Sequence, residues 1–181
     1  MLKYLKQSLD LAFPFDVCIW AVVTSAFWDM MRFGEVTVKS QKEFDGLKHL
    51  KQRDAFIQED LNGKDYARLD LPSMKTTKAG EIQSAFFTVE GNVCSIEALY
   101  NLSRVIPAGP DNPLFSWRDT KGKIKLIVKS KALSRINIIF NNNKWGTTFG
   151  HLFRIGGASF YYPSTRNRTK CHFGCRYFKL L

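Results

Sequence analysis

The sequence predicts a single, mainly helical α+β domain with one small antiparallel β-sheet. First, 181 residues are enough for one domain with a sizeable core. Second, hydrophobic residues make up 45% of the chain, which is typical of a globular protein rather than a disordered one. Third, several segments with helical apolar spacing surround one pair of short alternating segments.

The N-terminal part predicts two helices. Residues 2–12 form a short first helix that ends before Pro14. Asp16 is a good N-cap for a second helix, which we expect from Val17 to Met31. Because that segment is apolar nearly all round, the helix is expected to be buried, with Arg32 at its end.

The same apolar run raises the question of a membrane or signal segment. Lys3 and Lys6 precede it, as basic residues precede the apolar part of a signal peptide. The uninterrupted part, Val17 to Trp28, is too short to span a bilayer and is more typical of a buried helix. We therefore expect no membrane partner and an intracellular protein, nuclear if the source is eukaryotic.

The middle of the chain predicts a β-hairpin. Residues 41–65 are polar, and Asn62-Gly63 marks a turn. Tyr66 to Leu71 alternates between apolar and polar residues, which is typical of a strand. Glu81 to Val89 contains a second strand rich in Phe and Val, so residues 66–89 form a hairpin with a long polar loop.

Three further helices follow the hairpin. A helix from Ser95 to about Val105 is stopped by Pro107, and a short extended piece contains Phe115 and Trp117 before a turn at Gly122. Ser130 is expected to cap a helix from Lys131 to Asn141 whose inward face is Leu133, Ile136, Ile138, Ile139 and Phe140. The last helix starts at Thr147 or Thr148 and ends at Pro163.

Charge is distributed unevenly along the chain. Residues 1–100 hold 12 Lys/Arg and 14 Asp/Glu, whereas residues 101–181 hold 15 and 2. A basic half joined to a nearly neutral half predicts a polyanionic partner on one side of the molecule. The alternative is a well-solvated basic surface without a specific partner.

The four cysteines do not form a secreted disulfide framework. Cys18 and Cys94 lie in apolar runs and are expected to be buried thiols. Cys171, His172 and Cys175 are three potential zinc ligands, but a structural zinc needs four. The sequence therefore predicts no metal site and no cofactor.

The most informative stretch is His151-Leu-Phe-Arg154, followed by Gly156-Gly157. Residues three apart share a helix face, so an imidazole and a guanidinium would point the same way. Both groups suit a phosphate oxygen, and the two glycines allow another backbone to come close. Upstream, residues 30–35, which include Arg32 and Glu35, close the long apolar segment of the second expected helix, and Lys75 lies in the predicted hairpin loop.

Arg, then Lys, then His-x-x-Arg in this order resembles the catalytic domain of tyrosine recombinases, the phage-integrase family. The segments "MMRFGEVT" and "FRIGGASF" are most similar to the recombinases of fungal mobile elements. The resemblance covers about residues 13–160. It implies the integrase-like catalytic core as the fold, duplex DNA as the partner and DNA recombination and integration by breaking and rejoining as the activity.

The resemblance also implies a role for each matched residue. Arg32 would be the first phosphate-binding arginine with Glu35 supporting it, and His151 and Arg154 would complete the clamp on the charged phosphorus centre. Lys75, or alternatively Lys78, would donate a proton to the departing 5′-oxygen. Further DNA contacts are expected from Lys78, Arg118, Lys129, Lys131 and Arg135.

The end of the chain departs from the family pattern. The nucleophilic Tyr would follow the second Arg by roughly thirty residues, but only 27 follow Arg154. Tyr177 lies where the family has His or Trp, and Tyr161 and Tyr162 also have the wrong spacing. Without the nucleophile the 3′-phosphotyrosyl link cannot form, so we expect a truncated, inactive enzyme, although a substitute tyrosine stays possible in principle.

These observations give the expected organisation and the alternatives. Residues 1–12 would be a linker remnant, 13–162 the recombinase-like domain and 163–181 a divergent basic tail. The altered tail predicts a monomer. The first hypothesis is a DNA-binding, recombinase-like domain. The second is a purely non-catalytic DNA-binding remnant, and the third is a basic module that binds acidic partners or membrane surfaces.

Overall fold

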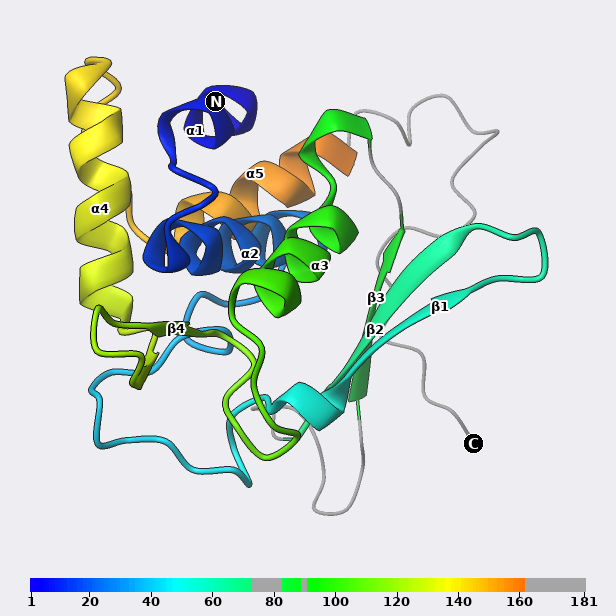
Figure 1. Cartoon of the computed structure of the whole chain (residues 1–181). Coiled ribbons are helices and arrows are strands. Elements are labelled where there is room, and N and C mark those ends of the chain that lie inside the picture. The colour runs from blue at the N-terminus through cyan, green and yellow to red at the C-terminus, as the bar shows by residue number, and fades with distance from the viewer. Residues whose placement is uncertain (73–82, 89–90, 162–181) are drawn as a thin grey trace.

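A buried helix, α2 (Pro14–Trp28), lies at the centre of the molecule. The computed structural model describes residues 1–72, 83–88 and 91–161. All side chains of α2 from Asp16 to Phe27 are buried. Helices α3 (Ser95–Val105) and α5 (His151–Tyr161) and strand β4 (Ser116–Arg118) pack against it (Figure 1). The apolar sequence of α2 is thus explained by burial on all sides.

The ends of α2 differ from the expectation. The helix begins at Pro14, with Phe13 as its N-cap, so Asp16 lies in the first turn and is not the cap. Proline favours a first helical position because its φ is preset and its missing N–H has no helical partner there. At the other end, Asp29 is the C-cap and Met30 adopts a left-handed conformation with φ 49°. Arg32 therefore lies beyond the helix.

The hairpin expected from the alternating segments is confirmed. Strands β2 (Asp65–Leu71) and β3 (Gln83–Thr88) pair antiparallel, with Leu69 opposite Ala85. Alternate side chains of β2, Ala67, Leu69 and Leu71, are buried in the main core. The opposite face of the sheet carries Arg68 and Asp70. Period-two alternation was therefore a valid strand signal here.

A third strand and a second small sheet were not expected. Strand β1 (Ala55–Glu59) follows the short 3-10 helix η1 (Gln52–Asp54) and pairs antiparallel with β2. Strand β1 was not predicted because it lies in the polar segment of residues 41–65. It is an edge strand in which Gln58 and Glu59 are exposed, so its sequence is not apolar enough to indicate a strand. Strand β4 pairs with β5 (Ile124–Leu126) across a turn in which Gly122 has φ 74°.

Helices α1 (Leu2–Ser8) and α4 (Lys129–Asn142) lie at one end of α2 (Figure 1). The expectation for α1 was four residues too long. The N-cap of α4 is Val128, so the expected cap Ser130 is wrong. Ile138 is also not inward-facing, since 52% of it is exposed. The buried residues of α4 are Ala132, Ile136, Ile139 and Phe140, which are spaced three or four apart and so share one helix face. Ile138 is two positions from Ile136, and residues two apart do not share a face.

The short 3-10 helix η2 (Gly91–Val93) leads into α3, which has the expected bounds. Helix α5 begins at His151, a few residues later than expected, and its expected end at Pro163 lies outside the described residues. Cys18 and Cys94 are buried free thiols, as predicted. Among the described residues, no helix is long and apolar enough to cross a membrane.

Candidate functional site

Arg32 is held in a closed turn by Glu35. The Glu35 carboxylate accepts the Arg32 backbone N–H at 2.7 Å with Oε2 and the guanidinium Nη1–H at 3.1 Å with Oε1. The Glu35 N–H donates back to the Arg32 carbonyl at 2.7 Å. The side chain of Arg32 is 38% exposed and that of Glu35 is 15% exposed. The guanidinium is therefore fixed in direction while part of it still faces solvent.

The next residue, Phe33, connects this turn to the beginning of α5. Its ring stacks on that of Phe153, with centroids 5.7 Å apart and planes 22° apart. It also lies against Gly150, where a Cβ would come within 2.5 Å of the Phe33 Cβ. Arg32 thus precedes a residue that contacts Gly150 and Phe153. These two in turn directly precede His151 and Arg154, so the fold brings the chain segment that carries Arg32 against the segment that carries His151 and Arg154.

The glycine pair of α5 permits a close helix crossing. A Cβ on Gly157 would lie 1.8 Å from the backbone carbonyl oxygen of Phe27. A Cβ on Gly156 would lie 3.0 Å from the ring of Phe27. Only glycine at position 157 allows the backbones of α2 and α5 to approach in this way. The close approach expected from the sequence is therefore present, and it fixes α5 against the end of α2.

His151 and Arg154 lie in the first turn of α5. His151 is exposed and Arg154 is partly buried. Neither side chain makes a hydrogen bond or ion pair with the described residues. A partly buried guanidinium that has no acidic partner among the described residues is suited to bind an anion. Within the described part of the chain, the site therefore has one arginine held by an acid and a second arginine without a side-chain partner.

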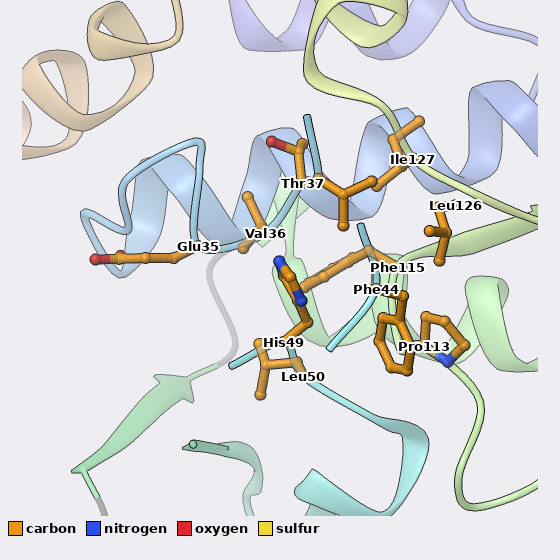
Figure 2. A pocket seen from close by; sticks show the side chains of 11 residues that line it. Glu35, Val36, Thr37, Phe44, His49, Leu50, Pro113, Phe115, Leu126 and Ile127 are labelled. Carbon is orange, nitrogen blue, oxygen red and sulfur yellow. The ribbon is translucent and has the colours of Figure 1, made fainter. Parts of the chain in front are cut away.

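Glu35 also borders a small hollow that sequence reasoning did not reveal. The hollow has a volume of about 20 Å³, and its lining includes Thr37, Phe44, His49 and Phe115. In Figure 2 the Glu35 carboxylate points away from the centre of the hollow, whereas the His49 ring borders it. The His49 ring stacks on Phe44, and its Nδ1 lies 3.0 Å from the Asp45 backbone nitrogen. The space is sufficient for roughly one water molecule.

Three expected site residues, Lys75, Lys78 and Tyr177, lie outside the part of the chain that the structure describes. So do Tyr162 and the three potential zinc ligands Cys171, His172 and Cys175, which the sequence analysis did not assign to a site. Within the described ranges, no group of three or more potential ligands could hold a metal ion. The role of the lysine and of any nucleophilic tyrosine stays a prediction.

The other expected DNA contacts lie in two different environments. Lys129 and Lys131 are exposed at the start of α4. Lys129 also donates its backbone N–H to the Val38 carbonyl at 2.9 Å. Arg118 instead donates to the carbonyl oxygens of Gly122 at 2.9 Å and Pro107 at 2.6 Å. The two lysines are thus available to an external anion, whereas the donors of Arg118 brace the β4–β5 turn.

Arg135 has a structural partner that the sequence did not reveal. Its Nε and Nη2 groups donate to Asp16 Oδ1 at 3.0 Å and Oδ2 at 2.7 Å. Asp16 is almost completely buried and also accepts the Asp10 backbone N–H at 3.0 Å. Hydrogen bonding to Asp16 raises the pKa of Arg135. Both oxygens of a buried carboxylate need hydrogen-bond partners, and Arg135 donates to both. The ion pair thereby joins α4 to the first turn of α2.

Comparisons with known proteins give a fold but no family. No protein-family model and no curated protein matches the sequence. Among solved structures, the chain is similar to the XerH site-specific recombinase bound to difH substrate in a pre-cleavage complex, with a TM-score of 0.57 and 14% identity. The match covers 92% of this chain and 41% of the recombinase chain. The likeness confirms the integrase-like α+β fold expected from the sequence.

Proposed function

We propose that the protein is a tyrosine-recombinase-like domain that binds duplex DNA through the junction of Arg32, His151 and Arg154. The observation that carries the proposal is the Phe33–Phe153 contact, which joins two distant segments. The partly buried Arg154, which has no hydrogen-bond or ion-pair partner among the described residues, adds to it. A phosphate oxygen would complete the bonding of Arg154, while Glu35 keeps Arg32 oriented. The structural likeness to a recombinase supports this proposal.

Within this proposal, each residue has a chemical task. Arg32 and Arg154 would neutralise the phosphate, and His151 would donate a further hydrogen bond to it. Lys75, or Lys78, would deliver a proton to the departing 5′-oxygen. The expected domain boundaries, 13–162 for the recombinase-like part and 163–181 for the basic tail, belong to the same proposal. The expected lack of recombinase activity is also part of this proposal, because Tyr177 does not have the spacing of the family's nucleophile.

Salt-dependent binding tests the proposed interface. We expect the chain to bind a short duplex, and we expect Arg154→Ala to weaken binding and to lower the slope of log K against log salt by about one. Arg53→Ala is the control, because Arg53 lies in η1 rather than in α5 or the Arg32 turn, and its side chain, which pairs with Asp111, is 51% exposed. Equal losses in both variants would contradict the proposal and favour a basic module with no preferred site.

A second experiment separates a binding domain from an enzyme. The protein is incubated with nicked and intact duplex DNA and then denatured, and a covalent protein–DNA adduct is sought. Retardation of DNA without an adduct is the expected result, because Tyr177 does not have the spacing of the family's nucleophile that forms the phosphotyrosyl link. An adduct that Tyr177→Phe abolishes would overturn the expected inactivity while leaving the DNA-binding proposal intact.

A further inference from the structure

A chain segment from early in the sequence pairs with the residues that lead into α4. Val38 and Val128 form a parallel bridge, and the side chains of both are buried. The Val38 N–H donates to the Ile127 carbonyl at 3.0 Å, and the Lys129 N–H donates to the Val38 carbonyl at 2.9 Å. Lys39 and Lys129 directly follow the two valines, and both are exposed. Because the bridge is parallel, these two lysines lie side by side on the surface.

The side chain of Gln41 makes a second connection between the same two segments. Its Nε2 donates to the Leu126 carbonyl at 2.6 Å, and its Oε1 accepts the Leu126 N–H at 3.0 Å. A side-chain amide carries both a donor and an acceptor, so it can pair with a backbone as a neighbouring strand would. Leu126 also packs with Val38 and Val128 in a small apolar cluster. The bridge and the amide together fix the position of one segment along the other.

The two lysines bring positive charges together with little compensation from acids. The Lys39 side chain is 88% exposed and pairs with Glu43 at 3.8 Å, and an exposed ion pair of this kind contributes little. Lys129 makes no ion pair with a described residue, and residues 120–161 contain no Asp or Glu. Lys131, two residues further along α4, is exposed as well. Like charges side by side repel each other, and an anion bound between them relieves the repulsion. The arrangement therefore favours a polyanion as the ligand.

The lysine pair lies within reach of a duplex that is bound at Arg32. Lys39 follows Arg32 by seven residues, which span at most about 25 Å when fully extended. The connecting chain is folded rather than extended, since the Thr37 hydroxyl donates to the Phe33 carbonyl. One turn of duplex DNA is about 34 Å long, which exceeds this distance. The two surfaces are therefore near enough to contact one duplex.

We propose that Lys39 and Lys129 form a second phosphate-binding surface of the DNA interface, and that the Gln41 amide is the positioning group that holds them side by side. The inference rests on the proposed function, because its partner is the duplex that would bind at Arg32 and Arg154. Lysine acts on a phosphate as a point charge, so this surface adds affinity without reading base sequence. The sequence indicated Lys129 but not Lys39, since the bridge beside them joins distant segments.

The first test measures duplex binding against salt concentration. Lys39→Ala and Lys129→Ala should each lower the slope of log K against log salt by about one. Between about 50 mM and about 200 mM salt, each variant should therefore lose about threefold less affinity than the wild type loses. Lys64→Ala is the matched control, because Lys64 is an exposed lysine in the turn between β1 and β2, and its slope should equal that of the wild type. The same slope for Lys39→Ala and Lys64→Ala would overturn the second surface.

The positioning role of Gln41 needs a double-mutant cycle in duplex binding. Gln41→Ala removes both bonds to Leu126, so Lys39 is no longer held beside Lys129. In this background Lys39→Ala should cost roughly half, or less, of the fold-change that it costs in the wild type. Denaturant unfolding identifies conditions in which the variants are folded, and Gln41→Met, which keeps the side-chain volume, replaces Gln41→Ala if the latter does not fold. A purely structural role would lower stability and leave the two substitutions additive in binding, and that outcome would overturn the positioning role.

Failure of this inference is distinguishable from failure of the proposed function, because Arg154→Ala and the wild type belong to the same series. If Arg154→Ala weakens duplex binding and Lys39→Ala does not, the second surface is wrong and the proposed function stands. If the wild type binds no duplex even at about 50 mM salt, where phosphate contacts are strong, the proposed function itself is refuted. Losses in both variants, with none in Lys64→Ala, are the expected result.

Discussion

Phe33 and Phe153, which are distant in sequence, stack with their ring centroids 5.7 Å apart and tie the Arg32 turn to the first turn of α5. Phe33 is 3% exposed and Phe153 is completely buried. Each aromatic residue directly follows or precedes a residue of the candidate site. The packing of two apolar rings therefore determines where two cationic side chains lie, although neither ring has any chemistry of its own with a phosphate.

The first prediction concerns this pair. Phe33→Leu and Phe153→Leu should each destabilise the fold, and a double-mutant cycle should give a coupling of about 1 kcal/mol, as for other packed aromatic pairs. The measurement is unfolding by denaturant. Both variants should also weaken duplex binding under conditions in which they remain folded. Phe44→Leu, which disturbs a stack on His49 instead, is the control. Additive effects of the two site variants would show that the rings do not act as a unit.

The second prediction concerns the helix crossing. Gly157→Ala should destabilise the chain by about 3 kcal/mol, the upper part of the range for overpacking. The new methyl group would meet the Phe27 carbonyl oxygen, which is backbone and cannot turn aside. Thermal or denaturant unfolding measures the loss. Gly34→Ala is the control, since a Cβ there would have no atom within 4 Å. Equal stability of the two variants would contradict the close crossing of α2 and α5.

Sequence patterns predicted the elements that carry a clear period or strong breakers. The alternation in β2 and β3 and the Pro107 stop after α3 gave the right bounds within a few residues. Edge strand β1 was not predicted, because its pairing with β2, rather than its own composition, makes it a strand. The ends of α2 were misplaced because Asp16 matched a capping pattern while Pro14 actually begins the helix.

The candidate site was predictable only in part. The motif residues Arg32, His151 and Arg154 follow from the sequence order, and the fold brings their chain segments together. Lys39 and His49 did not stand out, because an isolated lysine or histidine has no pattern until its neighbours are known. Arg135 was misleading in another way. The sequence does not distinguish an arginine on the surface from an arginine that pairs with a buried acid. The acid that pairs with Arg135, Asp16, is 119 residues away in the sequence.

The third prediction concerns the Cys18 thiol. It is completely buried, and burial raises its pKa above the ordinary value. Since the thiolate is the reactive form, Cys18 should resist alkylation at neutral and mildly alkaline pH and react once the chain unfolds. Peptide mapping by mass spectrometry after brief alkylation, with and without denaturant, measures this directly. Rapid labelling of Cys18 in the native chain would contradict the burial of α2.

The fourth prediction distinguishes two roles of Arg135. If the guanidinium mainly compensates the buried Asp16, then Arg135→Ala leaves an uncompensated buried charge and should lower the unfolding free energy by about 3 kcal/mol. The double variant Asp16→Asn, Arg135→Gln should recover part of that loss, because no isolated charge remains. Arg104→Ala is the matched control, since Arg104 is exposed and donates to Asn101. A stable Arg135→Ala chain with weakened duplex binding would instead assign Arg135 to the DNA interface.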